Sequence, residues 1–223
     1  MEMTEKMKQK IENGREYRNL TLEASDENDS YIVEGYATTF DQPYHLYYTK
    51  NGKGEKIEVR EMVSRDAFAN TDSRDTILQF DHEGKVYARV SNDTLKLSVD
   101  DHGLFVRAYL GGTEIGRNLY EEIKGGYINK MSFGFTVDED EMKPEGDGYL
   151  RTIKSVGKLF DVSAVSIPAN DYTEISARNH IDGAIDEIEA ERLRLEEERR
   201  ALAEQKENLL KKLKGLKGEP NEH

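Results

Sequence analysis

Cysteine and tryptophan are absent from this chain of 223 residues, and proline occurs only four times. Without cysteine the protein can form no disulfide, no zinc–thiolate site and no cysteine nucleophile. No run of about 18 apolar residues occurs, which excludes an ordinary transmembrane helix. The N-terminal stretch MEMTEKMKQKIENG also lacks the apolar segment of a signal peptide. These absences predict a soluble, intracellular protein that acts away from membranes.

Basic residues are outnumbered by acidic ones, with 32 Lys and Arg against 45 Asp and Glu, so the net charge is −13. Binding to a nucleic-acid backbone needs a basic face that releases counterions. We therefore expect no nucleic acid among the partners. Hydrophobic residues make up only 36% of the chain, which predicts a compact core flanked by highly polar segments.

Between Arg18 and about residue 175 the chain consists of short runs with alternating apolar and polar residues, separated by Gly, Asn and Asp. Two helices are predicted among them, over 64–70 after Ser64 and over 114–124 after Thr113. Residues 138–149, DEDEMKPEGDGY, predict a polar hairpin loop. The pattern favours a mainly β (α+β) fold, an antiparallel β-barrel wrapped by a few helices.

After Asn170 the composition changes to Glu, Lys, Arg, Leu and Ala, and residues 177–217 contain neither proline nor aromatics. Apolar residues recur there every seven positions: Ile181, Ile188, Leu195, Leu202, Leu209 and Leu216. The row four residues further on is mostly charged: Ile185, Arg192, Arg199, Lys206 and Leu213. A good coiled coil needs both rows apolar. The pattern therefore predicts a long helix with one narrow apolar stripe, either solvated or completed by a partner.

These patterns divide the chain into four parts. We expect a flexible N-terminal segment over 1–17, a β-barrel domain over 18–176, a helical scaffold-like or coiled-coil extension over 177–217 and a disordered tail over 218–223.

The stretch YINKMSFGFTV, residues 127–137, is an alternating strand with a hydroxyl between large apolar residues. One face of this strand carries Met131, Phe133, Phe135 and Val137, and the other carries Ser132, Gly134 and Thr136. The first face belongs in a core. The second has little bulk, so Ser132 is either a solvent-facing serine or part of a surface that another group approaches closely.

His82 is the one histidine of five that follows directly on an apolar strand, in TILQFDHEGK. Loops at strand ends commonly carry functional groups on a rigid scaffold. The other four lie in less distinctive surroundings: a Tyr-rich loop for His45, a turn for His102, the helix start for His180 and the terminus for His223.

Asp161 lies within the apolar strand KLFDVSAVSIPAN, where alternation places it on one face with Leu159 and Ser163. A buried carboxylate costs free energy unless it is paired. An imidazole would be a natural partner, since a carboxylate fixes a histidine tautomer. The alternative is an edge-strand aspartate that points into water.

Ser132, His82 and Asp161 are together the residue types of a nucleophile, its base and the group that orients the base. The spacing of these three residues along the sequence does not by itself show that they lie close together in the folded chain. A competing interpretation is a metal site that uses His82 with Asp81 and Glu83, although adjacent residues at a strand end point apart.

Four segments in this order, DHEGK, GLFVRAYL, KGGYINKMSFGF and FDVSAVSIPAN, resemble the maturation (prohead) proteases of tailed bacteriophages over about residues 18–178. The resemblance implies that Ser132 is the nucleophile, His82 the general base and Asp161 the third member of the triad. Many members of the family have Glu at this third position. The family is similar to the herpesvirus assembly proteases, whose core is an antiparallel β-barrel wrapped by helices.

The resemblance further implies a serine endopeptidase that needs no metal or cofactor. It would cleave scaffolding protein or capsid-protein scaffold segments, and itself, in the host cytoplasm inside the assembling procapsid. Its partners would be capsid and scaffolding proteins and a second copy of the chain, which would pair along the C-terminal helix. The competing function is a non-catalytic scaffold or assembly chaperone with a protease-like head.

Overall fold

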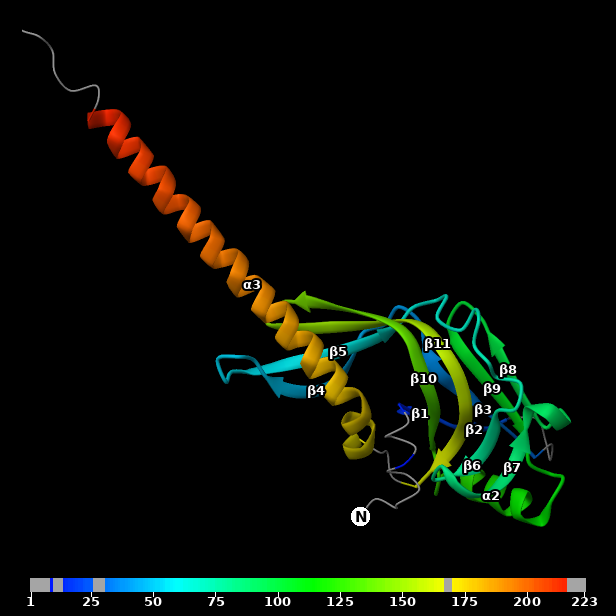
Figure 1. Cartoon of the computed structure of the whole chain (residues 1–223). Helices are drawn as coiled ribbons and strands as arrows, with labels where there is room; N and C mark the ends of the chain where they lie inside the picture. The colour runs from blue at the N-terminus through cyan, green and yellow to red at the C-terminus, as the bar shows by residue number, and fades with distance from the viewer. Residues whose placement is uncertain (1–8, 10–13, 26–30, 167–169, 216–223) are drawn as a thin grey trace, which may run out of the picture.

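The computed structural model describes residue 9 and residues 14–25, 31–166 and 170–215 (Figure 1). Its strands are β1 (Glu16–Thr21), β2 (Glu23–Ala24), β3 (Ile32–Thr39), β4 (Tyr44–Lys50), β5 (Lys56–Val63), β6 (Ile77–Phe80), β7 (Glu83–Arg89), β8 (Leu95–Val99), β9 (Gly103–Tyr109), β10 (Lys130–Glu145) and β11 (Gly148–Val165). Its helices are the 3-10 turn η1 (Val90–Asn92), α2 (Glu114–Lys124) and α3 (Asn170–Gly215). The predicted mainly β fold with a few helices is confirmed.

The strands form two sheets, one with the order β1-β10-β11-β5-β4 and with β6 and β7 attached, the other with the order β2-β3-β9-β8. The main core lies between these sheets and α2. Among the described strands neither sheet closes on itself, so the predicted closed barrel is wrong. The reason lies in β11, which pairs in parallel with β5 over Tyr149–Ile153 and with β6 over Asp161–Ala164, so the sheet forks instead of returning to its first strand.

Several local predictions also need correction. Residues 138–149 form the arm of a long β-hairpin, because β10 continues to Glu145 and β11 starts at Gly148. Residues 65–70 form consecutive turns rather than the helix predicted after Ser64, and His45 lies on β4 rather than in a loop. The helix after Thr113 is confirmed as α2, since the Thr113 side chain accepts a hydrogen bond from the Gly116 N–H.

A β-bulge interrupts the pairing of β10 with β11. Gly134 pairs with Asp161, whereas the next residue, Phe135, pairs with Leu159, so Phe160 is the extra residue. The bulge turns Leu159 into the core, and the predicted shared face of Leu159 and Asp161 is therefore wrong. The bulge therefore allows β11 to place Leu159 in the core and the Asp161 carboxylate on the opposite side of the sheet.

A buried cluster of two arginines and two glutamates fixes β1 against the sheet. Arg18 Nε and Nη2 lie 2.5 and 2.6 Å from the two Glu61 oxygens, and Arg151 Nη1 and Nη2 lie 2.7 and 2.9 Å from those of Glu16. Burial alone would raise the pKa of Glu61, but the two arginines more than offset this and lower it to about 2. The cluster therefore stays charged and ties β1, which carries Tyr17, to β5 and β11.

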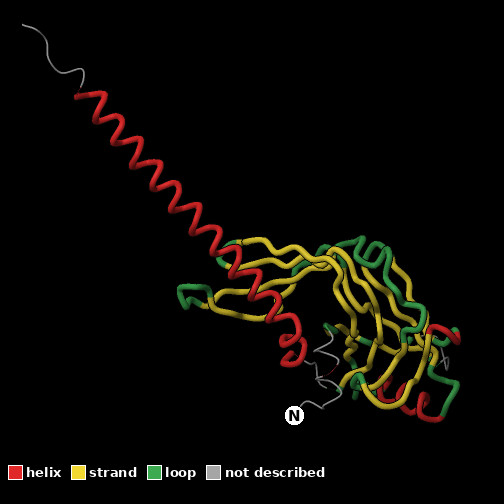
Figure 2. Tube along the Cα trace, in the orientation of Figure 1, coloured by secondary structure: helices red, strands yellow, loops and turns green. Residues whose placement is uncertain are grey.

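The first turns of α3 pack on a second, smaller core made by β4, β5 and the hairpin arm. Ile181 and Ile185 are buried there, and Asp182 Oδ1 accepts a hydrogen bond from the Tyr47 hydroxyl at 3.0 Å. Beyond this point α3 extends away from the sheets, as Figure 2 shows, and its leucines are exposed, Leu202 by 67%. The predicted terminal segments 1–17 and 218–223 lie largely or wholly outside the described residues, although β1 already begins at Glu16.

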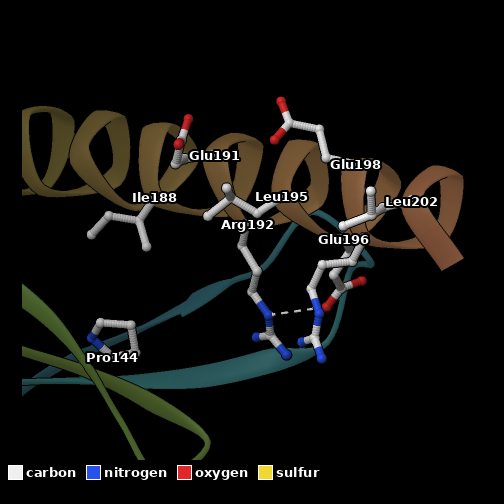
Figure 3. Close-up of a pocket in the computed structure, with 9 residues that line it drawn as sticks. Pro144, Ile188, Glu191, Arg192, Leu195, Glu196, Glu198 and Leu202 are labelled. Atoms are coloured by element: carbon white, nitrogen blue, oxygen red, sulfur yellow. Dashed lines mark ion pairs between the residues drawn. The ribbon is translucent and has the colours of Figure 1, made fainter. Parts of the chain in front are cut away.

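A groove of about 720 Å³ lies where α3 passes the tip of the hairpin arm (Figure 3). Its apolar lining consists of Pro144, Ile188, Leu195 and Leu202. Arg192 and Glu196 form an ion pair across one turn of α3 at 3.5 Å. None of Ser132, His82 and Asp161 lines this groove.

The packing of α3 gives a stability prediction. Ile181→Ala should lower the free energy of unfolding by about 2–5 kcal/mol, because it empties a fully buried position in the second core. The matched change Leu202→Ala should stay within about 0.5 kcal/mol of the wild type, since Leu202 is exposed on the same helix. Urea denaturation of both variants measures this. Equal stability of the two variants would show that α3 does not dock on the sheet.

Candidate active site

The pairing of three strands places the predicted site residues together. Ser132 on β10 lies opposite Ser163 on β11, and Gly134 lies opposite Asp161. Opposed residues of an antiparallel pair point to the same side of the sheet. On the other side of β11, β6 pairs as far as Ala164 with Phe80, which brings His82, two residues beyond Phe80, to the same end of β11.

His82 lies in a two-residue turn between β6 and β7, whose strands close at the pair Phe80 and Glu83. Both turn residues are left-handed, Asp81 with φ 47° and His82 with φ 59°. This backbone is typical of the tightest hairpin turns, but it carries some strain in residues other than Gly, less in Asn, Asp and His than in most. Such strain persists only where the surroundings fix the backbone.

Asp81 supplies that fixation through three hydrogen bonds to the end of β11. Its N–H donates to the carbonyl of Ala164 at 2.9 Å. Its carboxylate accepts from the N–H of Ser166 at 2.9 Å and from the Ser166 hydroxyl at 2.8 Å. The turn that carries His82 is thereby joined to the strand that carries Asp161.

His82 and Asp161 form a buried pair. The imidazole Nδ1 lies 2.9 Å from Oδ2 and 3.1 Å from Oδ1 of Asp161, and the two residues are 2% and 1% exposed. A carboxylate only accepts hydrogen bonds, so Nδ1 carries the proton. Nε2 is then the nitrogen that can act as a base. The alternative of an Asp161 that points into water is wrong.

Gly134 and Tyr17 complete the surroundings of this pair. A Cβ on Gly134 would lie 2.9 Å from both Asp161 carboxylate oxygens and 2.8 Å from Tyr17 Cε1, so any larger residue would displace them. The Tyr17 ring packs edge-on against the His82 ring, with centroids 4.4 Å apart. Burial and, next, the charge of Asp161 raise the pKa of Tyr17, so its phenol stays neutral. The groups that lie close to the Ser132 and Gly134 face of β10 are therefore Tyr17 and Asp161 of the same chain.

Ser132 is buried, with an exposed fraction of 0%, so the interpretation of a solvent-facing serine is wrong. Within the described part of the chain, the hydroxyls of Ser132 and Ser163 have no hydrogen-bond partner. Ser132 shares its strand face with Asp161, the partner of His82, and a serine, an imidazole and a carboxylate are the groups that nucleophilic acyl transfer uses. The sequence pattern missed Tyr17, which was placed in the flexible lead-in, and the anchoring role of Asp81.

The remaining histidines lie elsewhere. His45 is exposed and contacts Glu58 at 2.9 Å, His102 packs edge-on against Tyr36, and His223 is outside the described residues. His180 lies 3.4 Å from Asp140 on the exposed side of α3. None of the three described ones joins the Ser132 strand face.

The competing metal site is not supported. His82 contacts Asp161 and Asp81 contacts Ser166, so these two side chains serve different partners. Across residues 14–25, 31–166 and 170–215, no group of three His, Asp or Glu side chains is placed to hold a metal ion. In the same ranges no helix is long and apolar enough to cross a membrane.

Comparison with known proteins identifies relatives of this chain. The family model described as caudovirus prohead serine protease matches residues 18–187. Over 153 residues the chain is 28% identical to the prohead protease of Enterobacteria phage HK97, a match that covers 68% of this chain and 62% of that protein. The chain thus spans less than two thirds of this relative's length. No solved structure matches the chain significantly. Because this family model matches well over half of the chain, the chain belongs to the caudovirus prohead serine protease family.

Proposed function

We propose that this protein is a serine endopeptidase of prohead maturation, with Ser132 as nucleophile, His82 as general base and Asp161 as the group that orients the base. The observation that carries the proposal is the buried contact of His82 Nδ1 with Asp161 at 2.9 Å, on the sheet face that also presents Ser132. Family membership supports the same reaction class.

The catalytic cycle has two halves. Ser132 Oγ attacks the scissile carbonyl carbon while His82 Nε2 takes its proton, and Asp161 stabilises the resulting imidazolium. His82 then returns the proton to the leaving amine, which gives an acyl-enzyme. In the second half, water attacks the acyl-enzyme with the same proton transfers through His82, and the second product leaves Ser132. Because Ser132 is fully buried in the free chain, a peptide can reach it only after a local opening.

The proposed substrates are capsid or scaffolding precursors, and the chain itself, inside the procapsid in the host cytoplasm. The relative from phage HK97 bears the name prohead protease, which supports this setting. The exposed leucines of α3 are proposed to bind scaffold or a second copy. A non-catalytic assembly chaperone remains the competing function, and it predicts no reactive serine.

Covalent labelling tests the proposal. The protein, alone and mixed with the capsid precursor of its own phage, is treated with diisopropyl fluorophosphate and mapped by peptide mass spectrometry. We expect the phosphoryl adduct on Ser132 and none after heat denaturation. Absence of an adduct in both samples would favour the chaperone, and an adduct on another serine would refute the assignment of Ser132.

The anchoring of the His82 turn gives a further prediction. Asp81→Gly should lower the labelling rate of Ser132 by about 10–100-fold, because glycine keeps the left-handed backbone but loses the two carboxylate bonds to Ser166. Asp81→Asn should retain most of the rate, since its amide can both accept from the N–H and donate to the hydroxyl of Ser166. Equal rates in the Gly and Asn variants would show that the carboxylate does not position His82.

A further inference from the structure

Ser163 is a second serine in the site that the triad does not use. It lies directly opposite Ser132 in the register of β10 and β11, and two residues from Asp161 along β11. Directly opposed residues have Cβ atoms about 4.5–5.5 Å apart. Ser163 is fully buried, and within the described chain its hydroxyl has no hydrogen-bond partner.

A buried hydroxyl without a partner destabilises the folded chain, and native proteins retain few such groups. Alanine would fill nearly the same space in this strand without that cost. A donor that is held ready for a group absent from the free protein would explain why the position carries serine. The group that arrives beside Ser132 during acyl transfer is the carbonyl oxygen of the substrate.

We propose that the Ser163 hydroxyl is a donor to the oxyanion, an inference that rests on the proposed function. As Ser132 Oγ bonds to the carbonyl carbon, its proton passes to His82 Nε2 and the carbonyl π electrons move to oxygen. That oxygen accepts a hydrogen bond from Ser163 Oγ–H. When the amine leaves, these electrons re-form the C=O bond and the proton passes from His82 to the amine nitrogen.

The arrangement around Ser132 is consistent with this role. His82 contacts Asp161 and Tyr17, and both of these lie close to Gly134, two residues along β10 from Ser132. Ser163 lies beside Ser132 across the strand pair. The contacts of His82 are thus displaced from Ser132 along β10, whereas Ser163 is displaced from it across the strand pair.

The test compares the reaction of Ser132 with diisopropyl fluorophosphate in the wild type, Ser163→Ala and Ser163→Cys. Loss of one oxyanion donor costs on the order of 10²–10³ in rate, so both variants should lose about that factor in the maximal labelling rate, with a half-saturation concentration within about 3-fold of the wild type. Cysteine keeps the bulk but is a weak donor. The melting temperature should be unchanged or higher in Ser163→Ala.

Ser155→Ala is the matched control, the same change on β11 outside the site, and should label at the wild-type rate. Wild-type labelling speed in both Ser163 variants would overturn the inference and leave the proposed function standing. A rate loss that follows a drop in melting temperature in both variants would also overturn it, because packing would then explain the loss. An unlabelled wild type would instead refute the proposed function, and an adduct on Ser163 would exclude it as the donor.

Discussion

Replacing Ser132 by alanine should reduce peptide-bond cleavage by a factor on the order of 10⁶, because a protease that loses its nucleophile retains only the weak catalysis of the rest of the site. The fold should remain intact. Ser132 is fully buried with an unpartnered hydroxyl within the described chain, so alanine removes a polar group that costs stability there. We therefore expect an inactive variant that melts at or above the temperature of the wild type.

Processing of the capsid precursor, followed by gel electrophoresis and intact mass, measures this loss. Ser155→Ala is the control for a serine-to-alanine change in the same sheet and should cleave normally. A folded Ser132→Ala protein that kept even a tenth of wild-type cleavage would remove Ser132 from the reaction.

The three candidate site residues could be picked out from the sequence because each is anomalous in a local pattern. Ser132 interrupts an apolar strand, His82 ends one and Asp161 lies within another. Alternation assigns faces correctly as long as a strand is regular. The approach of His82 Nδ1 to Asp161 at 2.9 Å depends on the pairing of β6 with β11, a contact between residues distant in sequence that local patterns do not specify.

The supporting residues were missed for physical reasons. The bulge at Phe160 shifts the alternation by one residue, so Leu159 and Asp161 lie on opposite sides of the sheet. Tyr17 follows a highly charged segment, yet the pairing of Arg18 with Glu61 holds its strand in the sheet. Charged residues predict solvent exposure unless a partner of opposite charge, far away in sequence, is buried with them.

The same limit explains the errors in architecture. Many short alternating runs indicate a β fold, but they do not distinguish a closed barrel from two open sheets, because closure depends on which strands meet at the edges. The polar arm of the β10–β11 hairpin has the composition of a loop. One side of this arm nevertheless packs on the second core, through Tyr149 and Met142. The narrow stripe of α3 likewise mixes docked residues such as Ile181 with exposed ones such as Leu202.

Replacing His82 should abolish cleavage almost as completely as replacing Ser132, since a serine without its base is a poor nucleophile. His82→Ala also removes the partner of the buried Asp161 and changes a residue with φ 59°, so this variant should lose stability as well. His82→Asn separates the two effects. Asparagine tolerates the left-handed backbone and provides an amide, but it has no basic nitrogen.

The expected outcome is a folded and inactive His82→Asn protein, next to active His45→Ala, His102→Ala and His180→Ala controls. Added imidazole should restore part of the cleavage to His82→Ala, because the deleted ring leaves a site between Tyr17 and Asp161 that a free imidazole can enter. The same imidazole should do nothing for Ser132→Ala, which has a base but no nucleophile. If His82→Asn cleaved the precursor normally, or if the His102 variant were the inactive one, the strand-end histidine would not be the base. Rescue confined to His82→Ala would instead assign proton transfer to this ring, since a purely structural loss gives a soluble base no reaction to perform.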